Sequence, residues 1–176
     1  MVTSRIVATG AGIPSQVITN DDLAQIMDTS DEWIRQRTGI GERHISGGED
    51  LSYYTTKAAR QIIERAGIAP EDIDLIVVAT VTADYCTPSA ACMVQKEIGA
   101  VNAVAFDVTA ACSGFLYGVS VADKFIRCGV YKNALVIGGE ILSKIVDWQD
   151  RSTCVLFGDG AAGVLLERSE SQDRKS

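Results

Sequence analysis

The sequence has a single histidine, His44, and no C-x-x-C pair among its cysteines. A zinc site draws on several cysteine or histidine ligands at short spacing, so a site of that kind is excluded and no metal is expected. The cysteines are five, an odd number: Cys86, Cys92, Cys112, Cys128 and Cys154. Because the first residues also lack a secretion signal, we expect reduced thiols and a cytoplasmic protein.

Long apolar runs and an excess of positive charge are also missing. No apolar stretch approaches the roughly 20 residues that span a bilayer. Lysine and arginine number 16 against 23 aspartates and glutamates, which gives a net charge of −7. Such an acidic chain is a poor partner for nucleic-acid phosphates. With 176 residues, 47% of them hydrophobic, we expect one compact domain that binds neither nucleic acid nor membrane.

The sequence does contain an alternation of strand and helix patterns. Continuous apolar runs predict buried strands over 74–80, 103–108 and 133–140. Helical spacing and stop signals predict helices over 51–66, over 89–98 and after Cys112. The final segment, 152–167, has two apolar runs around Gly-Asp-Gly and predicts an antiparallel hairpin. Strands that alternate with helices indicate an α/β fold with a layered sheet.

Two further helix starts precede these elements. In "TNDDLAQIM", Thr19 or Asn20 is the predicted N-cap, and acidic residues follow in the first turn. In "TSDEWIRQRTG", Thr29 or Ser30 is the predicted N-cap and Gly39 the stop. Both helices are therefore expected before the longer one that begins near residue 51.

The stretch "FDVTAACSGFLYGVSVADKF", 106–125, places Cys112 where a strand ends and a helix begins. A thiol there faces unpaired N–H groups and the positive end of the helix dipole, which favour the thiolate. Small residues around it, including Gly114, leave room for a substrate, as in a nucleophile elbow. Cys112 is thus a candidate nucleophile, although a free cysteine is often only a small buried hydrophobe. The other four cysteines are interpreted as packing residues.

Three other motifs are weaker. "TGAGIP" (9–14) lacks the last glycine of a dinucleotide fingerprint, and "GDGAAG" (158–163) lacks the Lys-Ser/Thr of a phosphate loop. His44, in the predicted loop "GERHIS", could serve as a base for Cys112. A structural role is more common for a histidine between charged residues, and we favour it here.

Four motifs together resemble one family. They are "TSDEWIRQRTGIGERHI" (29–45), "TPSAAC" (87–92), "FDVTAACSGF" (106–115) and "LFGDGAAG" (156–163). In this order they resemble β-ketoacyl-acyl-carrier-protein synthase III, the condensing enzyme that initiates bacterial fatty-acid synthesis. The resemblance implies the N-terminal half of a thiolase-like fold, a mixed five-stranded sheet with helices on both faces. We expect this half-domain over 1–168 and a polar, disordered tail over 169–176.

The resemblance also implies the chemistry of Cys112. Its thiolate would accept an acyl group from acyl-coenzyme A, which is a substrate, so no cofactor is expected. Trp33 and Arg151 would stack on the adenine from both sides. Three more residues would lie along the coenzyme A: Thr29, Arg37 and Thr38.

The acyl pocket is expected from three residues. Leu142 and Phe157 would line it. Thr87 stands before Pro88, where many relatives carry a bulky residue that closes the pocket. A small side chain there predicts that acyl chains longer than acetyl are accepted.

The family's second half supplies a histidine, an asparagine and an oxyanion N–H, and none of these is found here. Losing one oxyanion donor typically costs about 10²–10³ in rate, so condensation with malonyl-acyl-carrier protein is not expected from this chain alone. A homodimer is expected through the strand near "AVAFDV", 103–108, and a second chain could carry the other half. Two alternatives stay open: a related thiolase-fold enzyme of secondary-metabolite or hydroxymethylglutaryl-coenzyme A type, and a non-catalytic partner subunit of a complete synthase.

Overall fold

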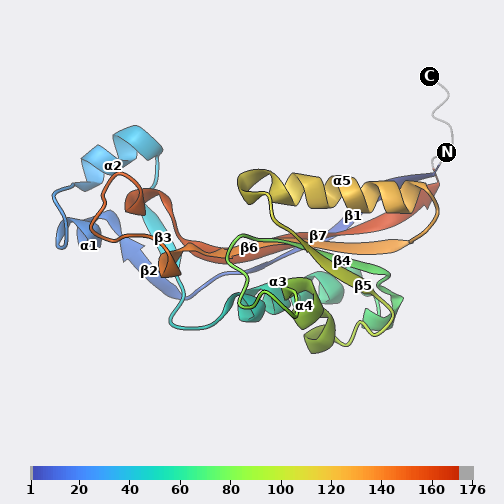
Figure 1. Cartoon of the computed structure of the whole chain (residues 1–176). Helices are drawn as coiled ribbons and strands as arrows, with labels where there is room; N and C mark the ends of the chain where they lie inside the picture. The colour runs from blue at the N-terminus through green and yellow to red at the C-terminus, as the bar shows by residue number, and fades with distance from the viewer. Residues whose placement is uncertain (1, 171–176) are drawn as a thin grey trace, which may run out of the picture.

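The fold is built on a mixed five-stranded sheet, seen in a computed structural model that describes residues 2–170 (Figure 1). In spatial order the strands are β1 (Val2–Gly12), β7 (Asp159–Glu170), β6 (Asn133–Ile141), β4 (Leu75–Ala79) and β5 (Val104–Val108). β4 runs parallel to β5 and β6, whereas β7 runs antiparallel to β6 and β1. The predicted mixed sheet of five strands is confirmed.

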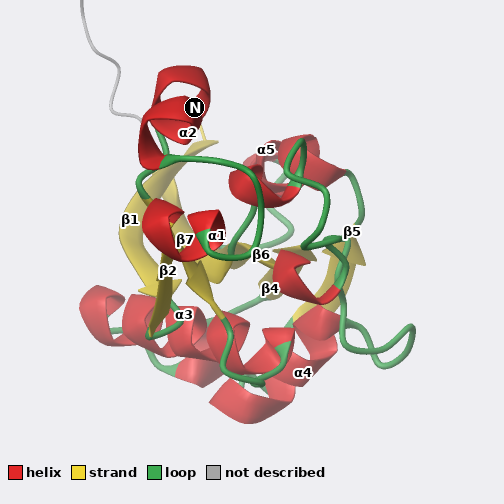
Figure 2. Ribbon diagram, turned by 90° about the vertical axis from the view of Figure 1, so that its left-hand side faces the viewer, coloured by secondary structure: helices red, strands yellow, loops and turns green. Residues whose placement is uncertain are grey.

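Helices cover both faces of this sheet (Figure 2). α3 (Leu51–Ala66) and α4 (Ala90–Ile98) lie on one face, and α5 (Gly114–Arg127) lies on the other. The packing of β4 explains its continuous apolar run. Ile76 and Val78 pack in the core with α3 and α4, whereas Leu75 and Val77 pack with α5 on the other face. A strand buried on both faces has no polar face to expose.

A smaller lobe projects from one end of the sheet (Figure 1). It holds α1 (Asn20–Ala24), α2 (Asp31–Thr38) and a two-stranded antiparallel sheet of β2 (Gln16–Thr19) with β3 (Glu42–Ile45). Both predicted N-caps are confirmed, since Thr19 forms a capping box with Asp22 and Ser30 accepts from the Trp33 N–H. Gly39 ends α2 in the left-handed conformation with φ of 75°.

The prediction of a hairpin over 152–167 is wrong. Its first apolar run forms a 3₁₀ turn, Cys154–Leu156, and its second run is part of the single strand β7. Cys154 and Val155 are buried in the lobe with Leu23 and Ile34, so they are not free to pair with β7. β7 instead inserts between β6 and β1 and uses both of its edges.

The predicted tail boundary is also corrected. β7 continues to Glu170, and Ser169 and Glu170 pair with Thr3 and Val2 of β1. The rest of the predicted tail, 171–176, lies outside the described residues. Among the residues that are described, no helix is long and apolar enough to cross a membrane.

The close approach of β1 to α3 yields a test of stability. A Cβ at Gly12 would lie 2.1 Å from the backbone oxygen of Tyr54, so Gly12→Ala forces the helix and strand apart. We expect it to lower the free energy of unfolding by about 1–3 kcal/mol, measured by urea denaturation. Gly47→Ala is the control, because the nearest atom there is a Glu49 carboxylate oxygen at 3.4 Å. Equal effects of the two changes would contradict the packing argument.

Candidate functional site

Cys112 lines an open cavity of about 430 Å³ at the carboxyl ends of β4 and β6. Its thiol is exposed. The cavity is lined by Ala79, Ala111, Cys112, Phe115, Gly138, Gly139, Glu140, Leu142, Leu156, Phe157, Gly158 and Gly160. The structure thus brings the predicted residues Leu142 and Phe157 to the same cavity as Cys112. Carboxyl ends of parallel strands are the usual place for ligands in α/β sheets.

The backbone around Cys112 is tightly constrained. Ala111 has φ of 45°, in the left-handed region that residues with a Cβ rarely adopt. Cys112 lies in a 3₁₀ turn, Ala111–Ser113, and α5 begins two residues later at Gly114. The thiol therefore precedes the helix rather than occupying its first turn, but the predicted junction of strand and helix is confirmed.

Two glycines allow α5 to lie close to the sheet. A Cβ on Gly114 would be 3.1 Å from the Ala79 Cβ, and one on Gly118 would be 3.0 Å from a Val136 methyl. Because neither glycine has a side chain, α5 packs directly over β4 and β6. The close packing of Gly114 and Gly118 on the sheet fixes the position of Cys112 relative to the carboxyl ends of β4 and β6.

A second cluster lies in the lobe, around Trp33 on α2. The guanidinium carbon of Arg37 is 4.3 Å from the Trp33 ring centroid, and that of Arg151 is 5.0 Å away. Arg151 also donates to the backbone oxygen of Asp28. Residues far apart in the sequence thus meet at one indole, as expected for cation–π contacts.

The two threonines predicted beside this cluster differ in their hydrogen bonds. The Thr38 hydroxyl donates to Ile34 O at 2.7 Å and accepts from Ile40 N at 3.0 Å, so it stabilises the end of α2. The Thr29 hydroxyl is buried and has no hydrogen-bond partner within the described part of the chain. Thr29 is therefore the one with unused hydrogen-bonding capacity.

Between β6 and β7 the chain makes one excursion into the lobe (Figure 1). After β6 it passes Leu142 at the cavity, reaches Arg151 at Trp33, and returns to the cavity at Phe157. Near Arg151, Asp150 accepts from the hydroxyls of Ser152 and Thr153, which lowers the pKa of the Asp150 carboxyl. An ionised Asp150 therefore holds the turn that carries Arg151.

Two other candidates lie elsewhere. Thr87 is exposed in the connection between β4 and α4 and does not line the cavity. His44, expected in a loop, is in β3 opposite Val17, and its Nδ1 is 2.7 Å from Pro14 O. The two-stranded sheet that holds His44 was not predicted. His44 does not line the Cys112 cavity either.

The other cysteines only partly match the packing interpretation. Cys154 is buried and Cys92 is half-buried, whereas Cys86 and Cys128 are exposed. Burial, and to a lesser degree the nearby Asp150 carboxylate, raises the pKa of the Cys154 thiol. Cys154 therefore stays protonated near neutral pH and is a poor nucleophile.

Glu140 is a residue of this site that none of the sequence motifs identified. It ends the apolar run of β6 and lines the cavity beside Cys112. A charged residue directly after "LVIGG", at the carboxyl end of a predicted buried strand, was the signal that could have identified it.

Known proteins resemble the chain throughout the described fold. The sequence model of the family described as 3-oxoacyl-[acyl-carrier-protein] synthase III matches residues 106–176. The β-ketoacyl-[acyl-carrier-protein] synthase III of Lactococcus lactis subsp. cremoris MG1363 is 56% identical over 172 residues, which are 98% of this chain and 53% of that protein. The Streptococcus thermophilus LMD-9 protein of the same name is 59% identical over 159 residues, 90% of this chain and 50% of that protein.

Solved structures agree with these sequence matches. The 3-oxoacyl-[acyl-carrier-protein] synthase III of Aquifex aeolicus VF5 superposes with a TM-score of 0.94 and 52% identity, over 96% of this chain and 55% of that one. The priming β-ketosynthase of the R1128 polyketide pathway has a TM-score of 0.93 and 35% identity, over 96% of this chain and 51% of that one.

The sheet, its helices and these superpositions define one half of a thiolase-like fold. The half in question is the N-terminal one. The chain resembles the N-terminal half of β-ketoacyl-[acyl-carrier-protein] synthase III. It spans about half the length of the curated relatives that it matches.

The contrast between the exposed Cys112 and the buried Cys154 predicts selective alkylation. With iodoacetamide near neutral pH, Cys112 is expected to react at least tenfold faster than Cys154, because the latter is protonated and inaccessible. Peptide mass spectrometry after timed quenching measures both rates. All five cysteines should react in denaturing urea, which controls for peptide detection. Equal rates for the two thiols in the folded protein would refute the assignment.

Proposed function

We propose that Cys112 is the acyl-accepting nucleophile of a fatty-acid-initiating condensing enzyme, with acyl-coenzyme A as donor. The observation that carries this proposal is the exposed thiol at the mouth of a cavity with an apolar wall of Phe115, Leu142 and Phe157. The 52–59% identity to synthase III proteins supports the reaction class.

The acyl transfer is a thioester exchange. The Cys112 thiolate attacks the thioester carbonyl of acyl-coenzyme A, and the new carbon–sulfur bond forms as the bond to coenzyme A breaks. Coenzyme A leaves as a thiolate and takes up a proton. The product is an acyl group held on Cys112 in the cavity, ready for condensation.

The Trp33 cluster is proposed to bind the nucleotide end of coenzyme A. Trp33 and Arg151 would stack on the adenine, and Arg37, Thr29 and Thr38 would lie along the rest of the molecule. Stacked planes are about 3.5 Å apart, so an adenine between two of them needs roughly 7 Å. Because Arg151 is only 5.0 Å from the Trp33 centroid, it must move outward when adenine enters. The buried Thr29 hydroxyl would reach such a ligand only when its side chain turns outward.

The second half-reaction, condensation with malonyl-acyl-carrier protein, is proposed to need residues that this chain does not supply. Near its start α5 exposes Leu116, by 65%, and Tyr117, by 56%. The other half of the family's length, on whichever chain it lies, would cover these side chains. Pairing across a two-fold axis is proposed at β5, an edge strand where Val104 is exposed.

A related condensing enzyme is the second candidate, supported by the 35% identity to the priming ketosynthase of a polyketide pathway. Such an enzyme would use the same cysteine with a different donor or acceptor. A panel of acyl donors and carrier proteins discriminates between the two candidates.

Intact-mass spectrometry after incubation with acyl-coenzyme A tests the nucleophile. We expect the mass of one acyl group to be added to the chain and to be lost on hydroxylamine treatment. Cys112→Ser should abolish the adduct, because an alcohol in place of the thiolate is a far weaker nucleophile. The Cys128→Ser variant, which changes another exposed thiol, should still be acylated. Absence of any Cys112-dependent adduct would favour a non-catalytic partner subunit.

The acyl length is tested with acetyl-, octanoyl- and dodecanoyl-coenzyme A. The apolar wall of the cavity predicts faster acylation by the longer donors. Thr87 does not line the cavity of this chain, so its small side chain would act only at a channel that another chain completes. Thr87→Phe should reduce acylation by dodecanoyl-coenzyme A at least tenfold relative to acetyl-coenzyme A if Thr87 helps to form the channel. Equal or faster acylation of the unmodified protein by acetyl-coenzyme A would reject the proposal.

A further inference from the structure

Glu140, at the end of β6, is held by three hydrogen-bond donors at the edge of the Cys112 cavity. Its Oε1 accepts from the Val81 N–H at 2.9 Å. Its Oε2 accepts from the hydroxyls of Thr80, at 3.1 Å, and Thr82. The carboxylate thus clamps the turn that follows β4.

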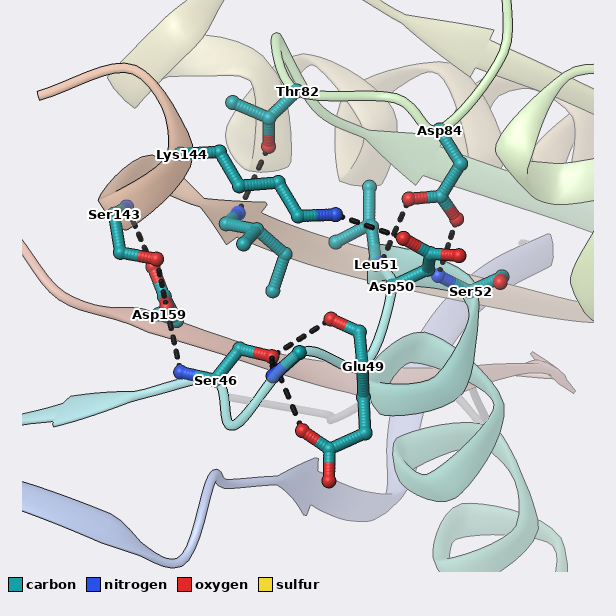
Figure 3. A network of polar contacts seen from close by, with 12 residues as sticks. Ser46, Glu49, Asp50, Leu51, Ser52, Thr82, Asp84, Ser143, Lys144 and Asp159 are labelled. Carbon is teal, nitrogen blue, oxygen red and sulfur yellow. Dashed lines mark hydrogen bonds and ion pairs between the residues drawn. The ribbon is translucent and has the colours of Figure 1, made fainter.

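The surrounding hydrogen bonds require a carboxylate at this position. The Thr80 hydroxyl accepts from the Thr82 N–H at 3.0 Å. The Thr82 hydroxyl, drawn in Figure 3, accepts from the Ile141 N–H at 2.9 Å. Each hydroxyl therefore has its proton free to donate, and both protons are directed to Glu140 Oε2. A glutamine of the same shape would turn an N–H₂ group toward at least one of these donors, whichever way its amide is oriented.

The clamped turn contacts the backbone on both sides of Cys112. The Thr80 N–H donates to the oxygen of Val108, the last residue of β5, at 3.2 Å. Ala79 lies under Gly114, the first residue of α5, where an added Cβ would come within 3.1 Å. The strand that leads to Cys112 and the helix that follows it are therefore held by the same short segment, 79–80.

We propose that Glu140 is a positioning residue for Cys112. It acts through the Thr80–Thr82 turn, which sets the strained segment between Val108 and Gly114 and so the direction of the thiol. Among the described residues no hydrogen bond joins Glu140 to the Cys112 thiol, so the proposed role is positioning and not proton transfer. The consequence for acyl transfer rests on the proposed function, but the positioning of the thiol does not.

The experiment compares Glu140→Gln and Thr80→Val, which disrupt the clamp from opposite sides. Thr80→Val leaves the charge of Glu140 unchanged, and Thr80→Ser restores the hydroxyl. Glu64→Gln makes the same chemical change on an exposed part of α3 and serves as a remote control. Thermal unfolding of each variant reports whether the fold is retained.

The first measurement is the rate of iodoacetamide alkylation at Cys112 divided by that at Cys128, an exposed thiol on the same chain. The ratio is expected to fall at least threefold in Glu140→Gln and in Thr80→Val, and to recover in Thr80→Ser. The double variant should be no worse than the more affected single variant, because both changes break one unit.

The second measurement is the rate of acylation at saturating acyl-coenzyme A. A fall of about 10- to 100-fold, with little change in the concentration for half-saturation, is expected for a misdirected nucleophile. If the unmodified protein is not acylated at all, the proposed function fails while the alkylation ratio still tests Glu140.

Two results would overturn the inference. An unchanged alkylation ratio in both folded variants would show that the clamp does not position the thiol. A ratio that rises in Glu140→Gln and is unchanged in Thr80→Val would show that Glu140 acts on the thiolate only by its charge. If Glu140→Gln does not fold, the comparison of Thr80→Val with Thr80→Ser decides.

Discussion

The close packing of α5 on β4 and β6 is the constraint on which the candidate site depends. It exists because Gly114 and Gly118 present no side chain to Ala79 and Val136. Protein interiors are packed too densely for a methyl group to be added there without a shift. The N-terminal end of α5 is therefore fixed over the carboxyl ends of the strands. The residues before it must turn sharply, with Ala111 in the left-handed region. The exposed position of Cys112 follows from this geometry.

Carboxylates that accept backbone N–H groups hold the other loops at this edge of the sheet. Asp84 accepts from the N–H groups of Leu51 and Ser52 at the start of α3 (Figure 3). Asp107 makes the matching pair of bonds to the start of α4. Asp159 joins two loops through Ser46 and Ser143. Such charge-assisted bonds are directional, whereas exposed ion pairs such as Lys144 with Asp50 contribute only about 0–1 kcal/mol.

The sequence predicts well those features that depend on local chemistry. Thr19, Ser30 and Gly39 were identified because helix caps are set by neighbours a few residues away. The strand-to-helix junction at Cys112 was likewise visible as a change of hydrophobic period.

Features that depend on distant partners were not predicted. β7 looked like part of a hairpin because nothing in its own residues shows that both of its edges are paired. The small antiparallel sheet of β2 and β3 pairs two four-residue strands that are separated in the chain by two helices. No short turn between the strands therefore indicates the pairing in the sequence. Glu140 was missed because its three donors come from the end of another strand, about 60 residues earlier in the chain.

The two faces of α5 separate the two stages of the proposed reaction. The inner face, through Gly114 and Gly118, sets the thiol that would accept the acyl group, and every contact involved lies within this chain. The outer face exposes Leu116 and Tyr117 near the start of the helix, with the polar Ser120 and Lys124 further along. Large exposed side chains such as these two are suited to burial under a second layer. The layer that covers the outer face would lie beside Cys112, where the groups for the condensation step are needed. In the proposed reaction acylation would need only the half described here, and condensation would need both halves.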